Sequence, residues 1–103
     1  MDRYGERERY YAAHAFNTRG VANAILGNIK EAVDDYDEAI RLNPNFRVAL
    51  LNRGDLYEKQ GKLKDSLVDF EKARHARDPI EDEQDLIIAR SPTRVIPLRT
   101  SRT

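Results

Sequence analysis

Cysteine is absent from this chain of 103 residues, glycine occurs only five times and proline four times. The lack of cysteine excludes disulfides, so a small hydrophobic core must hold the fold by itself. The composition is 40% apolar and 35% charged, which is typical of a soluble and largely folded chain. A length of 103 residues fits one domain.

An excess of either charge is also absent, because 18 basic residues balance 18 acidic ones. This balance argues against duplex DNA or an anionic membrane as the partner. Long apolar runs are missing too: none exceeds four residues, the length of the run at 48–51, which is far too short for a membrane span. The start, MDRYGERERYY, is too charged for a secretory signal. We therefore expect a cytoplasmic chain with no membrane partner, and the lack of cysteine fits a reducing compartment.

What the chain does contain is an internal repeat at an offset of 34 residues. The positions identical in both copies are Ala15/Ala49, Arg19/Arg53, Gly20/Gly54, Gly27/Gly61, Lys30/Lys64, Asp35/Asp69 and Ala39/Ala73. The pairs that keep an apolar residue are Phe16/Leu50, Ile29/Leu63, Val33/Leu67 and Tyr36/Phe70. Two copies of one packing unit require such matching positions, so the sequence predicts a tandem repeat.

Within each copy the apolar residues recur with helical spacing, which predicts amphipathic helices. The expected ranges are 7–26, 29–42, 46–60 and 63–77. Asn28 followed by Glu31 predicts a capping box at the start of the second helix.

The four glycines of the two repeat copies fall into two classes. Gly27 and Gly61 lie in the turns between helices, whereas Gly20 and Gly54 lie inside helices, where glycine costs roughly 1 kcal/mol relative to alanine. Since this costly glycine recurs in both copies, we expect the paired helix to lie close against it.

A further helix is expected beyond the second copy. Asp78-Pro79-Ile80 supplies an N-cap residue followed by proline at the first helical position, and Pro92 ends the segment. Ile88 stands where a third glycine would belong, so residues 80–90 are expected to form a capping helix rather than a third repeat. Residues 91–103, SPTRVIPLRTSRT, are expected to form a flexible basic tail.

These features resemble the tetratricopeptide repeat (TPR) family over residues 13–79. The matching positions are the opening bulky residue (Phe16, Leu50), the interior glycine (Gly20, Gly54), the turn glycine (Gly27, Gly61), a small residue (Ala32, Ser66), the aromatic (Tyr36, Phe70), the later alanine (Ala39, Ala73) and the closing Pro44. The departures are Asn23 in place of the usual tyrosine, which the second copy keeps as Tyr57, Arg19 and Arg53 in place of a common leucine, and Pro79 one residue late.

The resemblance implies an all-α solenoid of antiparallel helix pairs that form a short right-handed superhelix. The repeats would be residues 13–46 and 47–79, with residues 1–12 extending the first helix. The first helix of each repeat would line a concave groove that binds a peptide or a helix of a partner protein. The resemblance implies a structural role for nine residues: Gly20, Gly27, Gly54, Gly61, Ala39, Ala73, Tyr36, Phe70 and Pro44.

Family geometry also implies which side chains face the groove: His14, Asn17, Val21, Ala24, Ile25, Val48, Leu51, Asn52, Asp55 and Glu58. From these we predict the partner-binding residues to be Asn17, Val21, Ile25, Val48, Leu51, Asn52 and Asp55. The four aliphatic members would form an apolar strip, which is either a contact surface or a surface covered by the first helix or the tail.

One variant of the family grips the C-terminal carboxylate of chaperones with lysine, asparagine and arginine from three consecutive repeats. Only Asn52 matches that pattern here, while Asn17 and Val21 stand where it needs lysine and asparagine. Several charge-assisted donors are required to hold a desolvated carboxylate, so this mode is not expected.

Catalysis, metal binding and cofactor binding have no sequence support. His14 and His75 lack a nucleophile or a paired carboxylate at suitable spacing and are interpreted as surface histidines. The acidic segment 81–85 lacks the glycine and the alternating spacing of a calcium loop.

The preferred function is therefore a non-enzymatic interaction module. The alternative is a self-associating structural protein that stacks through the open repeat edge or through residues 95–98 of the tail. Nucleic-acid binding is not expected, because the arginines of the tail have no aromatic residue beside them to stack on bases.

Overall fold

The computed structural model describes residues 4–77, which form four helices. They are α1 (Glu6–Ile25), α2 (Ile29–Leu42), α3 (Arg47–Lys59) and α4 (Leu63–His75), with no strand within this range. The all-α fold class is confirmed, and each helix begins and ends within two residues of its expected range. The expected capping helix at 80–90 and the tail at 91–103 lie outside the described residues. Within the described range, no helix has both the length and the apolar character needed to cross a membrane.

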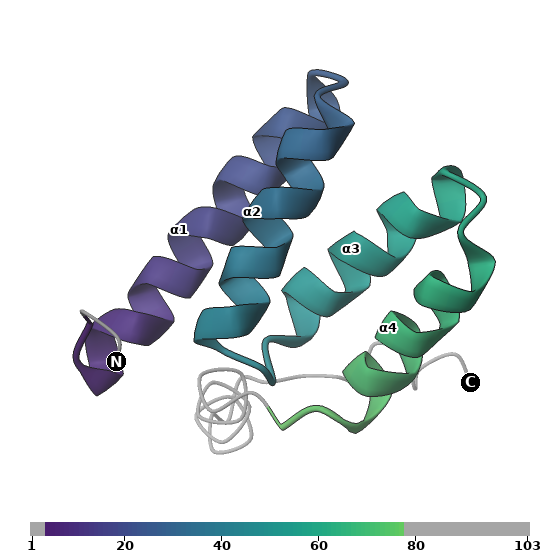
Figure 1. Ribbon diagram of the computed structural model, residues 1–103. Helices are drawn as coiled ribbons and strands as arrows, with labels where there is room; N and C mark the ends of the chain where they lie inside the picture. The colour runs from purple at the N-terminus through teal and green to yellow at the C-terminus, as the bar shows by residue number, and fades with distance from the viewer. Residues whose placement is uncertain (1–3, 78–103) are drawn as a thin grey trace, which may run out of the picture.

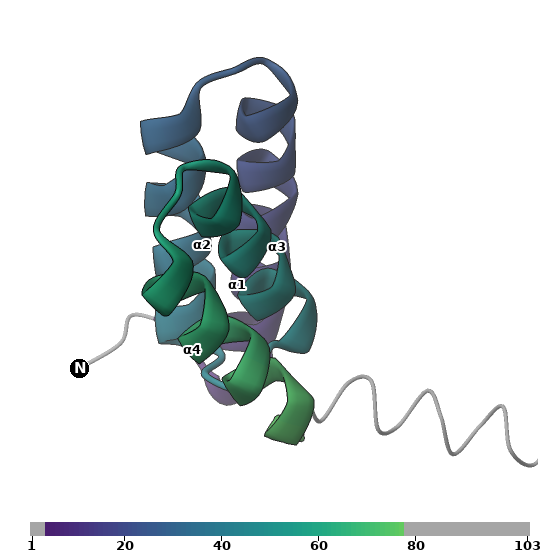
Figure 2. The ribbon, with the colours of Figure 1, turned by 90° about the vertical axis from the view of Figure 1, so that its right-hand side faces the viewer.

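The helices are stacked in chain order as two antiparallel pairs. Figure 1 shows α3 between α2 and α4, with α1 on the outer side of α2. Turned by 90°, the molecule shows α3 in front of α1, and these two helices contact each other (Figure 2). Because the loops are short, consecutive helices pack next to each other. The observed stack is the repeat of helix pairs that the 34-residue offset predicts.

Each pair is closed by the same glycine turn. Gly27 has φ 87° and Gly61 has φ 80°, a backbone region that other residues rarely adopt. At the first turn the Gly27 amide donates to the Ala24 carbonyl at 3.1 Å, and the Asn28 amide donates to the Asn23 carbonyl at 2.8 Å. These two bonds satisfy carbonyls at the end of α1 that the helix itself leaves without a partner. The second turn repeats them at 3.0 Å and 2.8 Å.

The expected capping box at Asn28 is wrong. Asn28 does occupy the N-cap position of α2, but its side chain makes no capping hydrogen bond. Its Nδ2 instead donates to Oδ1 of Asn23 at 3.3 Å. The reason is the short loop: Asn28 also completes the hydrogen-bonded turn of Gly27, and its side chain is directed back to α1.

Small side chains allow the helices to approach closely in the core. Ala39 and Ala73, which are equivalent in the two copies, are 0% and 1% exposed. Ala39 packs with Leu42 and Phe46 near the end of the first pair, whereas Ala73 packs with Leu50 in the second. Close packing of this kind leaves little room for added volume at these positions.

The two helix-interior glycines lie directly under aromatic rings. A Cβ atom at Gly20 would lie 2.6 Å from Cε1 of Tyr36, and one at Gly54 would lie 2.7 Å from Cε1 of Phe70. Real Cβ atoms do not approach a neighbour so closely, so only glycine fits without displacing the ring. This is the close approach expected of these positions.

Candidate partner-binding face

A bidentate arginine–aspartate ion pair joins the two helices within each repeat. Arg19 of α1 donates from Nη2 to Asp35 Oδ1 at 2.7 Å and from Nε to the same carboxylate at 3.1 Å. Arg53 of α3 binds Asp69 in the same way, at 2.7 and 2.8 Å. Asp35 and Asp69 are 4% and 1% exposed, so the arginines supply hydrogen bonds that water cannot supply to these buried carboxylates.

Sequence reasoning did not predict these ion pairs. The available signal was that arginine and aspartate recur together at the 34-residue offset, 16 residues apart in each copy. A charged residue that recurs in both repeats and faces the neighbouring helix needs a partner of opposite charge.

Arg53 also connects the two repeats. Its Nη1 donates to Oδ1 of Asp37 on α2 at 2.8 Å, while the rest of the guanidinium holds Asp69 on α4. These hydrogen bonds raise the pKa of Arg53 above its ordinary value, with the bond to Asp69 contributing most. The Arg53 guanidinium thus links α3 to both α2 and α4.

Asn23 has a related role. Its Nδ2 donates to Oδ2 of Asp35 at 2.9 Å, on the side of the carboxylate away from the closest Arg19 contact. The hydrogen bonds from Arg19, followed by that from Asn23, hold the pKa of Asp35 below its ordinary value against the opposing effect of burial. In the second copy Tyr57 takes this position, and the Arg53 guanidinium lies 5.6 Å from the centre of its ring.

The first helices of the two repeats are held together by two asparagines. Asn52 of α3 donates from Nδ2 to Oδ1 of Asn17 on α1 at 3.1 Å. Asn17 is 6% exposed, whereas Asn52 is half-buried. Their hydrogen bond fixes the spacing of α1 and α3 on the side where the predicted partner-binding residues lie.

We call the seven predicted partner-binding residues the α1/α3 face: Asn17, Val21 and Ile25 of α1, and Val48, Leu51, Asn52 and Asp55 of α3. On α3 they follow a spacing of three to four residues and therefore share one side of the helix. Val48 and Leu51 are 39% and 42% exposed, and the Asp55 side chain is 58% exposed. This side of α3 presents two aliphatic side chains and one carboxylate to solvent.

The α1 members are arranged differently. Val21 is half-buried and packs against the core cluster that contains Tyr36 and Leu56. Ile25 is 80% exposed, but it is the last residue of α1 and corresponds by the repeat offset to Lys59 at the end of α3. The exposed aliphatic residues of the α1/α3 face therefore lie apart, with Val48 and Leu51 near the start of α3 and Ile25 at the end of α1.

Three further residues, His14, Ala24 and Glu58, were expected to face the groove. His14 is exposed and its ring stacks on Phe46, with 6.3 Å between ring centres. Glu58 is exposed on α3, and Ala24 is half-buried against the same core cluster as Val21.

The two histidines lie apart, on α1 and α4, and Nε2 of His75 lies 3.1 Å from Oε2 of Glu71. Residues 4–77 contain no cluster of side chains that could hold a metal ion.

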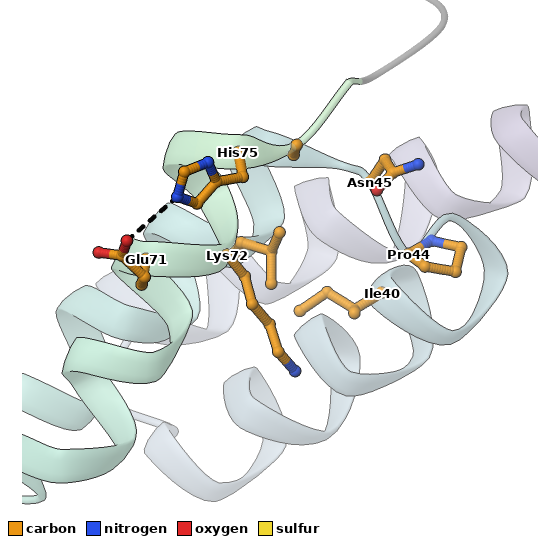
Figure 3. Close-up of a pocket in the computed structure, with 8 residues that line it drawn as sticks. Ile40, Pro44, Asn45, Glu71, Lys72 and His75 are labelled. Atoms are coloured by element: carbon orange, nitrogen blue, oxygen red, sulfur yellow. Dashed lines mark hydrogen bonds and ion pairs between the residues drawn. The ribbon is translucent and has the colours of Figure 1, made fainter.

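A surface hollow that the sequence did not indicate lies between the end of α2 and α4. It has a volume of about 450 Å³, and Ile40, Leu50 and Ala76 give it apolar walls. Glu71, Lys72 and His75 lie along its α4 side, where Figure 3 shows the His75–Glu71 contact. Its residues come from both repeats, so the hollow depends on how the repeats pack, which the sequence pattern does not specify.

Comparisons with known proteins agree with this architecture. A family model described as TPR repeat matches residues 20–61. The chain is similar to Tetratricopeptide repeat protein 6 of Homo sapiens, with 38% identity over 45 residues, which is 44% of this chain and 9% of that protein. It is also similar to DnaJ homolog subfamily C member 3 of Homo sapiens, with 34% identity over 80 residues, which is 78% of this chain and 15% of that protein.

A third similar protein is DnaJ homolog subfamily C member 7 homolog of Dictyostelium discoideum, with 32% identity over 59 residues, covering 57% of this chain and 11% of that protein. The chain thus spans only 9 to 15% of the length of these curated relatives.

Proposed function

Because the chain belongs to the tetratricopeptide-repeat family, whose repeats generally mediate protein–protein interaction, we propose that its α1/α3 face binds an extended segment or a helix of a partner protein. The family's repeats are in general non-enzymatic, and we propose no catalytic role and no cofactor. The residues proposed to form the site are the seven of the α1/α3 face.

The exposure of Leu51 is the observation that carries the proposal. Leu51 and Val48 lie one turn apart on α3 and remain about 40% exposed, although neighbouring Ala49 and Leu50 are fully buried. Burying two such side chains against an apolar residue of a partner is favourable by roughly 25 cal/mol per Å² of apolar surface. They are the natural anchors of a contact.

The polar members give the contact direction. Asp55 lies one turn beyond Leu51, and its carboxylate is 58% exposed and 3.4 Å from Nζ of Lys59 on the same helix. Because such an exposed pair contributes little, the carboxylate can still accept a hydrogen bond from a cation or backbone amide of the partner. Asn17 and Asn52 form the floor, where their mutual hydrogen bond holds the two helices at a constant spacing. Ile25 offers a separate apolar contact at the far end of α1.

Selection from a random peptide library displayed on phage tests the proposal. Peptides enriched on the intact chain are measured against two variants, Leu51→Glu and Ala15→Glu. Both place a carboxylate on an exposed helical position, but Ala15 lies two residues before Asn17 and therefore on the opposite side of α1.

The proposal expects Leu51→Glu to weaken peptide binding at least tenfold, the equivalent of about 1.4 kcal/mol. Ala15→Glu should leave it unchanged, and the helical circular-dichroism signal of both variants should match that of the parent chain. Equal binding to all three proteins would disprove the assignment of the α1/α3 face.

A further inference from the structure

Helix α3 is attached to the first repeat by side chains from two consecutive residues. Asn52 donates to Asn17 on α1 at 3.1 Å, and Nη1 of Arg53 donates to Asp37 on α2 at 2.8 Å. Consecutive residues of an α-helix point about 100° apart, so the two links reach the two different helices of the first repeat. Together they fix both the position and the tilt of α3, whereas either link alone leaves a point about which α3 can pivot.

The two links differ in how well they are protected from water. Asn17 is 6% exposed, whereas the side chain of Asp37 is 50% exposed. Arg53 is held from its other side by Asp69, whose side chain is 2% exposed. Release of Asp37 therefore leaves no buried charge without a partner, because Asp69 keeps the arginine and the exposed carboxylate is hydrated. The link between Arg53 and Asp37 is thus the one that opens more easily.

The first repeat shows that this link is not needed to form a helix pair. Arg19 is the equivalent of Arg53, and within residues 4–77 it forms its ion pair with Asp35 of its own repeat alone. Helices α1 and α2 nevertheless pack against each other along their lengths. The contact between Arg53 and Asp37 therefore serves the joint between the repeats.

Apolar side chains also join the repeats. Leu56 of α3 packs in the cluster of Ala32 and Tyr36, and Ile40 of α2 packs against the cluster that contains Leu50. Apolar attraction has no preferred direction, so these contacts hold the repeats together without fixing the tilt as closely as directed hydrogen bonds do. The tilt of α3 therefore depends on its polar links.

We propose that Asp37, which lies outside the α1/α3 face, is a positioning residue for that face, and that its ion pair with Arg53 is a salt-sensitive latch on the tilt of α3. With the latch closed, the exposed Val48 keeps a fixed place relative to α1. With the latch open, α3 pivots about Asn52, and a tilt of about 10° moves Val48, about 6 Å along the helix, by about 1 Å. The consequence for partner affinity rests on the function proposed for the α1/α3 face, whereas the tilt itself does not.

The tilt can be measured directly, because the chain contains no cysteine. In the full-length chain, spin labels are attached at Leu26→Cys and Gln60→Cys, the exposed C-cap residues of α1 and α3. Electron–electron double resonance then gives the distance between the two helix ends. Asp37→Asn is compared with Asp34→Asn, which makes the same change on the same helix at an exposed carboxylate paired with Lys30 of α2 itself.

In Asp37→Asn the distance distribution should shift or broaden by about 2 Å, since Gln60 lies about 12 Å from Asn52 along the helix. Salt at about 1 M should move the parent chain toward that distribution and leave Asp37→Asn unchanged. Asp34→Asn should match the parent chain, and so should Asp37→Glu, which keeps the charge. Identical distributions in the parent chain and Asp37→Asn would overturn the latch, as would an equal response of these two proteins to salt.

Peptide affinity separates the positioning role from the function of the face. For a peptide selected on the parent chain, Asp37→Asn should weaken binding about threefold, although Asp37 lies outside the face. Asp34→Asn should leave binding unchanged, and both variants should keep the melting temperature of the parent chain, because both ion pairs are exposed. Weaker binding by Leu51→Glu without any loss in Asp37→Asn would overturn the positioning role and leave the proposed function standing. Equal binding by Leu51→Glu and the parent chain would instead disprove the proposed function, and the spin-label distances would still decide the latch.

Discussion

The ring of Tyr36 lies so close to the backbone of Gly20 that a Cβ atom there would be 2.6 Å from Cε1. Tyr36 is 2% exposed and packs with Ala32 and Leu56, so the ring has no free space into which it can retreat. The second repeat contains the same contact between Gly54 and Phe70. These contacts set how closely the two helices of each repeat approach, and thereby how the first helices are presented to a partner.

Replacing Gly20 with alanine should destabilise the chain, although alanine is the better helix former. The added methyl forces Tyr36 to shift within a packed core, which costs about 1 to 3 kcal/mol. The roughly 1 kcal/mol gained in helix propensity offsets only the lower end of this range, so the net loss of stability should reach about 2 kcal/mol. Urea denaturation followed by circular dichroism measures the difference.

A second variant tests whether the ring contact causes the loss of stability in Gly20→Ala. In a Tyr36→Leu background the smaller side chain leaves room for the methyl, so Gly20→Ala should cost much less there. At Gly27, where nothing lies within 4 Å but φ is 87°, the cost of alanine comes from the backbone and should be the same in both backgrounds. Equal costs of Gly20→Ala in the two backgrounds would show that the ring contact is not responsible.

Replacing Arg53 with methionine should be severely destabilising. The change leaves the carboxylate of Asp69, whose side chain is 2% exposed, without its charge partner and also breaks the contact with Asp37. Loss of one partner from a buried pair costs about 3 to 5 kcal/mol. Thermal unfolding monitored by circular dichroism checks this.

The matched control is Arg74→Met on α4. Its ion pair with Glu71 has a similar distance, 2.8 Å between Nη2 and Oε2, but the two side chains are 69% and 60% exposed. Exposed pairs contribute little, so this variant should unfold at the temperature of the parent chain. Similar losses for both arginines would mean that burial of Asp69 does not determine the effect.

Acid should weaken the contribution of Asp35 in a predictable direction. Its pKa is held below the ordinary 3.8 in the folded chain, chiefly by the hydrogen bonds from Arg19, and returns to about that value on unfolding. The ion pair therefore stabilises the fold above the unfolded pKa, and this stabilisation disappears as the pH falls through the lower folded pKa.

Comparison with Asp35→Asn isolates this effect. The variant should be less stable than the parent at about pH 7, and the difference in unfolding free energy should shrink as the pH is lowered to about 3. Urea denaturation at a series of pH values measures it. A difference that stays constant or grows in acid would contradict the assigned ion pair.

Loss of the asparagine bridge should affect binding more than helix content. Asn52→Ala removes the donor to Asn17, whose side chain is buried, and leaves its Oδ1 without this partner, at a cost of about 1 to 3 kcal/mol. Because the bridge spaces α1 and α3, affinity for selected peptides should fall, while the helical signal should persist. Unchanged peptide affinity would remove the bridge from the proposed floor.

The sequence predicts the helices and turns that occur in each repeat, but few of the contacts between one repeat and the next. The 34-residue offset locates the helices and the turn glycines because each copy is under the same packing constraint. The Asn17–Asn52 bond and the hollow beside Ile40 depend on how one repeat sits against the next, for which a single pair of copies holds no pattern. Local sequence signals can also mislead. Asn28 matches a capping pattern, but in the short turn its side chain binds Asn23 and does not cap α2.

The most direct test of the proposed function is nuclear magnetic resonance of the ¹⁵N-labelled full-length chain titrated with a library-selected peptide. The account predicts that the largest amide shifts occur at Val48, Leu51 and Asp55, with those of α2 and α4 nearly unmoved. Shifts concentrated around Leu67, Glu71 and His75 would instead place the partner on α4 and contradict the account.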